Sequence, residues 1–351
     1  MPYLEDSTMQ RLGFAVIGAG LWGSTHARIF AEHPAVELAA VCDVDGERAR
    51  KLAESAGAKR WCTDFAEIAG DDSICAVGIA TPDFAHAAPA LAVLRGGKHL
   101  LVEKPLAFTV EECEQIIAAA REAGVKLMVD FHNRWSPPFF KAKVAIDAGE
   151  IGRPMYVYYR LSDTIFVPTQ MLSWAGKSTV AWFLASHCLD TIHWLLGERP
   201  ARVYCVRRSR VLASRGITTP DYYQTMLEFP SGATALMENS WILPQTTPNI
   251  IDLKCEIVGD KGALYVDGSH HRMLERYTQS EASYPDTFVA PIVHGKPLGF
   301  AVESIRHFVD CVIADREPLV TGEDGLAATR VIQAMERSAD TEQVVKLNWT
   351  D

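Results

Sequence analysis

Three groups of residues in this sequence have the types and the spacing that redox chemistry on a hydroxylated carbon requires. A glycine-rich loop at residues 18–23 follows an apolar segment, Lys104 lies in a Glu-Lys-Pro tripeptide, and His187 and Asp190 interrupt an apolar helical pattern. Glycine loops bind phosphates through backbone amides, a lysine ammonium can hold an alcohol or carbonyl oxygen, and a histidine exchanges protons near neutral pH. These groups predict a dinucleotide-dependent reaction of an alcohol or a carbonyl.

The glycine-rich loop has the pattern G-x-G-x-x-G, directly after a predicted strand and at the start of a predicted helix. The first glycine allows a tight turn, the second lets the backbone approach a pyrophosphate, and the third lets helix and strand pack closely. The next predicted strand ends at Asp43, whose carboxylate can bind the ribose hydroxyls of an adenosine. We expect cofactor contacts from Gly18, Ala19, Gly20, Leu21, Trp22, Gly23 and Asp43.

Asp43 also bears on the choice of cofactor. Its carboxylate would repel a 2′-phosphate, and the next residue, Val44, offers no positive charge to bind one. The sequence therefore predicts NAD, with NADP less favoured. The alternative is that Asp43 only begins the turn at residues 43–46.

Glu103 and Lys104 stand at the predicted carboxyl end of a parallel strand, where open α/β sheets bind their ligands. A lysine there can hydrogen-bond the reacting oxygen and lower the pKa of a nearby acid–base group. The alternative is a surface turn without a chemical role. We expect Lys104 to be catalytic and, with Glu103, to border the cofactor.

Residues 182–197 form a helical pattern that is apolar almost all the way round. In a regular helix, one face would carry the side chains of Phe183, His187, Asp190 and Trp194. Two interpretations compete: a structural histidine–aspartate pair in a core, or a pair in which His187 exchanges a hydroxyl proton and Asp190 binds a neighbouring hydroxyl. The presence of Lys104 and of the glycine loop favours the second.

Further polar and aromatic residues are candidate substrate ligands. Trp174 could stack on a sugar and Lys177 could bind a hydroxyl or carboxylate, although an anchoring tryptophan and a solvated lysine are equally good interpretations. Asn133 and Arg134 directly follow the last strand of the first predicted domain. Tyr158 lies on a strand face that would line either the substrate site or a subunit interface.

The elements that must position these residues fall into two regions with different secondary-structure patterns. Strand and helix patterns first alternate, which predicts a doubly wound, mainly parallel sheet with helices on both faces. The strands are expected at 12–20, 36–45, 74–82, 98–105 and 125–131, and the helices at 21–34, 46–57, 83–97 and 109–124.

After residue 154 strand patterns dominate, with turns at 230–232 and 260–262, which predicts an open, largely antiparallel sheet. Late helices are expected at 301–314 and 323–339. An α/β chain follows, with a dinucleotide-binding domain at 9–131 and an α+β substrate and oligomerisation domain at 132–351. The late helices could pack back on the first domain.

Composition and charge exclude several classes of partner. The chain has 351 residues, 48% of them hydrophobic, with a formal net charge of −10 and no basic stripe, so neither a nucleic acid nor a membrane is an expected partner. The acidic, polar residues 1–10 do not resemble a signal peptide, and the apolar runs are too short to cross a bilayer, so we expect a cytoplasmic location.

The eight cysteines form no C-x-x-C pair and lie mostly in apolar stretches. They read as small core residues in a reducing compartment. No histidine and cysteine cluster has zinc spacing, so no metal site is expected.

The chain resembles the Gfo/Idh/MocA family of oxidoreductases over nearly its whole length. The resemblance rests on "GAGLWG", "ATPDFAHAAPALAVLRGGKHLLVEKP", "HCLDTIHWLLG" and the closing "FVDCVIADREPLVTGEDGLAATRVIQAMERSA". It implies a Rossmann domain, a second domain whose sheet builds homodimers or homotetramers, and NAD(P)-linked oxidation or reduction of a sugar, polyol or related carbonyl. It also implies that Lys104 is the catalytic lysine and that Thr81, Pro82 and His86 lie near the nicotinamide.

The family's second catalytic segment has the pattern D-x-G-x-H-x-x-D, which places His187 at the acid–base histidine and Asp190 at the later aspartate. Its first aspartate is replaced here by Phe183. We expect an NAD-dependent enzyme acting on a sugar, an inositol-like polyol or a glycoside. The alternatives are an NAD-dependent glycosidase that oxidises its substrate transiently, and an NAD-binding sensor without catalysis.

Overall fold

The computed structural model describes residues 11–269 and 273–349, so the outermost residues of the two predicted domains, and residues 270–272, lie outside the description. The chain divides into two compact units that exchange short segments. Within the described residues, the first comprises 11–103, 115–128 and 305–319, and the second comprises 104–114, 129–304 and 320–349. The division at residue 131 stays a prediction.

The first unit is built on a six-stranded sheet in the order β3-β2-β1-β4-β5-β6. The pairs β1–β2, β1–β4, β2–β3 and β4–β5 are parallel. Its strands are short runs of apolar residues because helices cover both faces of such a sheet. They are β1 (Leu12–Ile17), β2 (Val36–Cys42), β3 (Arg60–Cys62), β4 (Ile74–Ile79), β5 (His99–Val102) and β6 (Leu127–Val129).

Helices alternate with these strands, and local capping explains where some of them begin and end. The Asp45 side chain accepts hydrogen bonds from the first amides of α2, and the helix stops at Gly57, whose φ is 73°. Phe14 of β1 packs at 5.1 Å from Phe30 of α1 and at 6.4 Å from Phe308 of α8, so one sheet face holds both helices. The helices are α1 (Leu21–Glu32), α2 (Gly46–Ala56), α3 (Ala66–Ala69), η1 (Asp83–Ala85), α4 (Ala87–Arg95), α5 (Val110–Ala123) and α8 (Phe300–Ile313).

The second unit contains a seven-stranded sheet in the order β12-β11-β7-β10-β9-β8-β17. Only β7 and β10 pair in parallel among these strands, and the other pairs are antiparallel. The strands are β7 (Pro154–Asp163), β8 (Arg202–Arg208), β9 (Tyr222–Glu228), β10 (Thr234–Ser240), β11 (Ile251–Gly259), β12 (Ala263–Asp267) and β17 (Val345–Lys346). Two small hairpins follow, β13 (Arg276–Tyr277) with β14 (Ala282–Ser283) and β15 (Ile292–Val293) with β16 (Lys296–Pro297).

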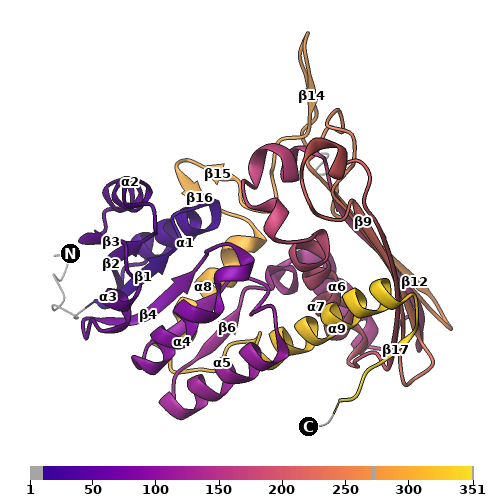
Figure 1. Ribbon diagram of the computed structural model, residues 1–351, viewed down its shortest axis with the longest axis horizontal. Coiled ribbons are helices and arrows are strands. Elements are labelled where there is room, and N and C mark those ends of the chain that lie inside the picture. Colours follow the sequence, from indigo (N-terminus) through magenta and orange to yellow (C-terminus); the bar gives the residue numbers. More distant parts are fainter. Residues whose placement is uncertain (1–10, 270–272, 350–351) are drawn as a thin grey trace, which may run out of the picture. The chain divides into compact units, whose positions relative to one another are not determined.

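One face of the seven-stranded sheet is covered by helices α6, α7 and α9, and among the described residues of this unit Figure 1 shows no helix over the other face. Along β7, Val157, Tyr159 and Leu161 are buried, as the period of a strand with one covered face requires. The helical segments of this unit are η2 (His132–Trp135), α6 (Pro137–Asp147), η3 (Val167–Met171), η4 (Ala175–Lys177), η5 (Ala181–Ala185), α7 (Ser186–Leu196), η6 (Ala213–Arg215) and α9 (Gly322–Thr341).

The predicted fold class is confirmed, including the hairpins β9–β10 and β11–β12. The sequence patterns do not predict β3, α3 or α6. The first two are short, and α6 starts at a Pro-Pro pair that is typical of a loop, although proline suits a first helical turn. The helix expected from residue 182 begins as a π-helical turn, η5, and becomes α-helical only at Ser186.

All eight cysteines are free thiols and seven of them are buried, which agrees with their expected place in the core. Among the described residues, no helix combines the length and the apolar character that crossing a membrane would need.

Candidate functional site

The three glycines of the loop between β1 and α1 differ in what an added Cβ atom would meet. Gly18 has a φ of 101°, and a Cβ there would lie 2.4 Å from the carbonyl oxygen of Ala80. A Cβ on Gly23 would lie 1.7 Å from the carbonyl oxygen of Gly18, so only glycine lets α1 pack this closely. A Cβ on Gly20 would meet nothing within 4 Å, so this glycine borders open space. The loop therefore leaves room for a ligand at its middle glycine.

The N-terminus of α1 faces this open space. Gly20 caps the helix without any side-chain hydrogen bond, and the Leu21 side chain is exposed. The first amides of a helix carry partial positive charge and bind phosphate oxygens. The predicted loop residues, Trp22 among them, thus lie on a helix end suited to a pyrophosphate.

The carboxylate of Asp43 is fixed against this loop by backbone amides. Its Oδ2 accepts a hydrogen bond from Ala19 N at 2.7 Å, and its Oδ1 accepts one from Asp45 N at 2.9 Å. The next side chain, Val44, is 94% exposed and supplies no cation for a 2′-phosphate. The donors and acceptors in this part of the first unit fit NAD.

Thr81, Pro82 and His86 form one small loop at the end of β4. Thr81 Oγ1 donates to the carbonyl oxygen of Ala85 at 3.2 Å, and Nε2 of His86 lies 3.1 Å from the carbonyl oxygen of Thr81. The structure thus holds these residues together, and their contact with a nicotinamide stays a prediction.

Glu103 ends the sheet hydrogen bonding of β5 and is buried. Its Oε1 lies 3.2 Å from Nε2 of His26, a fully buried residue of α1, and its amide donates to the carbonyl oxygen of Ile79. Glu103 therefore ties the Glu-Lys-Pro segment to the helix that follows the glycine loop. A direct contact of Glu103 with the cofactor stays a prediction.

Lys104 lies against Phe183 in the second unit. Its Nζ donates a hydrogen bond to the carbonyl oxygen of Phe183 at 3.0 Å and lies 4.2 Å from the centre of the Phe183 ring. The side chain is buried, so this cation–π contact is weakly screened and contributes about 1–2 kcal/mol. The lysine and the residue that replaces the family's aspartate are thus in direct contact.

Phe183 belongs to an aromatic cluster. The centre of its ring lies 6.1 Å from that of Trp174 and 5.7 Å from that of Trp241. Lys177, in the short η4 turn after Trp174, is exposed. The structure therefore brings Trp174 into the surroundings of Lys104, and a substrate contact of Lys177 stays a prediction.

Asp163, the last residue of β7, adds a carboxylate to these surroundings that the sequence patterns do not predict. Its Oδ2 accepts a hydrogen bond from Nε1 of Trp241 at 3.2 Å. Burial raises the pKa of Asp163 to about 7, against the opposing effects of this hydrogen bond and of the positive charge of Lys104. The only sequence signal is an acidic residue at the end of an apolar strand, which is common in turns.

His187, in the first turn of α7, is buried against other rings. The ring of His132 lies 4.8 Å away, and that of Phe131 packs edge-on at 6.4 Å. Burial, and then the charges of Lys104 and His132, hold the pKa of His187 well below its usual range. The imidazole is therefore neutral at pH 7, the form that can accept a proton.

Asp190 is engaged by Arg134 within the same unit. The guanidinium donates to Oδ2 of Asp190 from Nε at 3.1 Å and to Oδ1 from Nη2 at 2.6 Å, and Nη2 also lies 2.9 Å from Oδ1 of Asp324. Burial raises the pKa of Asp190 to about 6, while Arg134 opposes the shift. The two predicted ligands thus form a bidentate ion pair, so any substrate hydroxyl would have to share it.

Asn133 and Tyr158 lie on opposite sides of β7. Asn133 is buried and donates from Nδ2 toward Tyr159 Oη at 3.3 Å and Thr191 Oγ1 at 3.4 Å, on the face that the helices cover. Tyr158 is the neighbour of Tyr159 on the strand, so its side chain points to the opposite, helix-free face. This geometry favours the interface interpretation of Tyr158.

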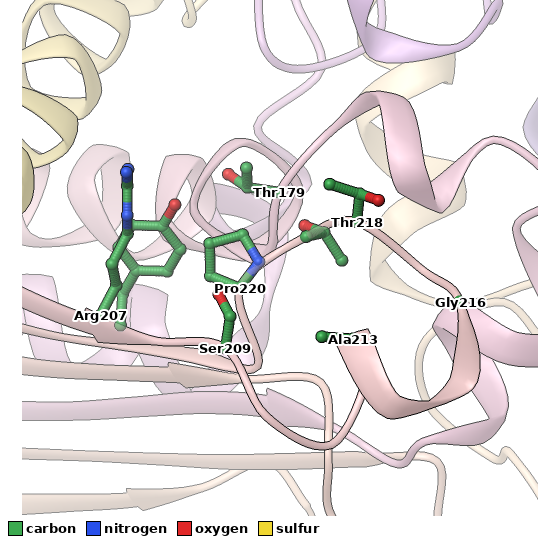
Figure 2. A pocket seen from close by; sticks show the side chains of 9 residues that line it. Thr179, Arg207, Ser209, Ala213, Gly216, Thr218 and Pro220 are labelled. Atoms are coloured by element: carbon green, nitrogen blue, oxygen red, sulfur yellow. The ribbon is translucent and has the colours of Figure 1, made fainter.

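The second unit also has a cavity of about 410 Å³ between the segment before η5 and the strands β8 and β9, shown in Figure 2. Its one cationic group, Arg207, is already paired with Glu336 and Asp340 of α9. Its nine lining residues include no histidine, lysine or carboxylate that could exchange a proton, so it is not the site of the chemistry. They are Thr179, Arg207, Ser209, Ala213, Gly216, Thr218, Thr219, Pro220 and Tyr223.

Two family models together match most of the chain. One, described as "Oxidoreductase family, NAD-binding Rossmann fold", matches residues 12–131, and the other, described as "Oxidoreductase family, C-terminal alpha/beta domain", matches residues 143–347.

Named relatives agree with this match. The scyllo-inositol 2-dehydrogenase (NAD(+)) of Bacillus subtilis (strain 168) is 29% identical over 90% of this chain and 92% of its own length. The crystal structure of GenD2 from gentamicin A biosynthesis in complex with NAD is 26% identical, covers 99% of this chain and all of its own, and has a TM-score of 0.81. The myo-inositol 2-dehydrogenase of Lactobacillus plantarum shares the fold, with 20% identity, a TM-score of 0.84 and coverage of 97% of this chain and 100% of its own.

Proposed function

Because the chain belongs to the Gfo/Idh/MocA family of NAD-binding oxidoreductases, we propose that it oxidises a secondary alcohol of an inositol or a related sugar, with Lys104 and His187 as its catalytic pair. The observation that carries the assignment of this pair is electrostatic. Burial first, and then the positive charge of Lys104, hold the pKa of His187 well below its usual range, so the imidazole is neutral. An oxygen-binding cation beside a neutral base is what removal of a hydroxyl proton requires.

In this reaction we assign separate roles to two residues of the second unit. Nδ1 of His187 is buried and has no hydrogen-bond partner among the described residues, so Nε2 is the nitrogen that we assign to proton exchange. Lys104 donates to the reacting oxygen and stabilises the negative charge that grows there as the proton leaves. NAD, when held by the first unit, would supply the hydride acceptor for the same carbon.

The first unit holds NAD in this proposal. The loop of residues 18–23 binds the pyrophosphate at the start of α1, and Asp43 binds the adenosine ribose. Thr81, Pro82, His86 and Glu103 are assigned to the nicotinamide side from the family resemblance.

The substrate is an inositol-like ring in our proposal because dehydrogenases of inositols are among the chain's relatives at 29–30% identity. Trp174 and Phe183 supply flat apolar surfaces for the C–H faces of such a ring. The proposed hydroxyl ligands are Lys177, Asn133, Arg134 and Asp190, the ion-pair partner of Arg134.

A panel of inositols, aldoses, uronates and glycosides, assayed for NADH formation with the purified protein, tests this function. We expect turnover of at least one inositol or sugar, and a loss of about two to four powers of ten in Lys104→Met and in His187→Gln. Variants that keep the wild-type rate on the true substrate would refute the catalytic pair. Release of reducing sugar without net NADH would identify the glycosidase alternative, and tight NAD binding without any turnover would identify the sensor.

We propose further that the helix-free face of the seven-stranded sheet forms a homodimer or homotetramer interface. The strand registers place several large side chains in one row across this face. Tyr158 is half-buried, and the exposed ones are Tyr204, Met226, Leu236 and Tyr265. An exposed apolar row of this kind marks an interaction surface. Leu236→Lys is expected to release monomers in sedimentation velocity, whereas an unchanged assembly size would exclude this face.

A further inference from the structure

Asp163 is a buried carboxylate that the proposed reaction does not yet use. Only 2% of the residue is exposed, and its position at the end of β7 is fixed by the sheet. It pairs in register with Ile251 of β11, and its carbonyl oxygen accepts a hydrogen bond from Leu243 N at 3.2 Å. The carboxylate therefore has a defined place instead of a mobile one.

Three contacts connect this carboxylate with Lys104. The indole Nε1 of Trp241 donates to Oδ2 of Asp163, and the Trp241 ring packs at 5.7 Å from the ring of Phe183. Phe183 in turn contacts Lys104 through both its carbonyl oxygen and its ring. The positive charge of Lys104 also lowers the pKa of Asp163, against the larger effect of burial, so the two groups interact electrostatically.

The burial of Asp163 is costly for the fold. One indole N–H is modest compensation for taking a carboxylate out of water, and such groups are concentrated at functional sites. Position 183, where the resembled pattern has an aspartate, carries a phenylalanine whose ring lies between Trp174 and Trp241. Position 183 thus supplies no carboxylate to Lys104, whereas Asp163 brings one into the same surroundings from β7.

We propose that Asp163 is the positioning residue of Lys104, and that its carboxylate keeps the ammonium charged and oriented toward the reacting oxygen. The charged group that acts on Asp163 is Lys104, and those that act on His187 are Lys104 and His132. Asp163 therefore acts on the histidine only through the lysine. The kinetic consequence rests on the proposed function, whereas the effect on Lys104 itself does not.

Competitive acetylation with acetic anhydride, followed by peptide mass spectrometry, tests the proposal without any substrate. The pH of half-maximal labelling of Lys104 is compared in the full-length wild type, in Asp163→Asn and in the double variant Asp163→Asn with Phe183→Asp. We expect this pH to fall by about one unit in Asp163→Asn, because an opposite charge nearby favours the ammonium form. The double variant, which returns a carboxylate to position 183, is expected to reverse most of the shift. An unchanged labelling pH in folded Asp163→Asn would overturn the proposal.

A second variant covers the case in which Asp163→Asn does not fold. Trp241→Phe keeps an aromatic ring against Phe183 and removes the indole donor that favours the ionised carboxylate. We expect a smaller shift in the same direction, and the same labelling pH as in the wild type would count against the proposal. NAD titration and thermal unfolding confirm that each variant is folded.

Kinetics separate this inference from the proposed function. If a substrate is found, Asp163→Asn is expected to lower kcat about 10- to 100-fold and to leave the KM for NAD unchanged, with partial rescue in the double variant. A labelling shift together with no turnover of any polyol would refute the proposed function alone. Turnover together with an unchanged labelling pH would refute the role of Asp163 alone.

Discussion

The glycine loop of the first unit and the Lys104 surroundings of the second offer a ligand different physical means of binding. The loop uses backbone amides and the absence of Cβ atoms, and its dimensions are set by close contacts such as that between Gly23 and the Gly18 carbonyl. The Lys104 surroundings use buried ionisable side chains, each of which changes the pKa of its neighbours. Substitutions in the loop should therefore act through steric fit at any pH, and substitutions near Lys104 through charge.

The largest effect is expected from removing the catalytic pair. Lys104→Met and His187→Gln should each lower kcat about 10²- to 10⁴-fold because the oxygen ligand or the base is lost. In His187→Gln, NAD affinity, measured by fluorescence titration, should stay within about twofold, because the loop lies in the first unit. A parallel loss of NAD affinity would show that the two regions are not separable.

A matched pair of glycine substitutions tests the steric side of the comparison. Gly23→Ala would place a Cβ 1.7 Å from a carbonyl oxygen and is expected to lower the free energy of unfolding by more than about 2 kcal/mol. Gly20→Ala meets nothing within 4 Å, so its stability should be near that of the wild type while its NAD affinity falls about tenfold. Equal denaturant midpoints for the two variants would contradict the assigned roles.

The pH dependence of stability in an Asp163 variant tests the electrostatic side of the comparison. Its folded-state pKa of about 7 lies above the unfolded value of about 3.9, so the folded state binds the extra proton, and the wild type loses stability as pH rises between these values. Asp163→Asn cannot ionise and should gain stability over the wild type progressively from pH 4 to 7, by up to about 4 kcal/mol. Urea midpoints at pH 4 and pH 8 measure this, and a difference between the variants that does not change with pH would contradict it.

A smaller effect is expected at the cofactor ribose. Asp43→Asn removes the negative charge that opposes a 2′-phosphate while keeping an acceptor for Ala19 N. NADP binding should improve relative to NAD by about tenfold. A fluorescence titration in which NADP already binds more tightly than NAD to the wild type would refute the cofactor preference.

Phe183→Asp is the mildest test, because it probes selectivity and not catalysis. The phenylalanine ring should favour a substrate with an apolar portion at this point, such as a deoxy carbon or an aglycone. The aspartate should instead favour more hydroxylated rings in a substrate competition assay. An unchanged ranking of substrates would remove the support for this role.

The same comparison explains how much of the molecule could be predicted from the sequence. The local structure of the loop was predictable because Gly18, Gly20, Gly23 and Asp43 lie within one continuous strand–helix–strand unit, where spacing fixes geometry. The alternation of strands and helices likewise predicted the fold class.

The Lys104 surroundings were predictable only in part. Lys104 and His187 lie in recognisable segments, but Asp163 ends β7 and Trp241 directly follows β10, and only the sheet brings the two together. The π-helical η5 also breaks the regular period that placed Phe183 and His187 on one stripe. Likewise, the ion pair of Arg134 with Asp190 joins residues 56 positions apart, a pairing that no local pattern contains.

The pH dependence of NADH formation on a confirmed substrate tests the central claim most directly, when the wild type is compared with Lys104→Met and Lys104→Arg. Loss of the positive charge should raise the pKa of His187, since Lys104 helps to hold it low. The acid limb of the residual activity should therefore move to higher pH in Lys104→Met and stay near the wild-type position in Lys104→Arg. An acid limb that is the same in all three proteins would contradict a Lys104–His187 catalytic pair.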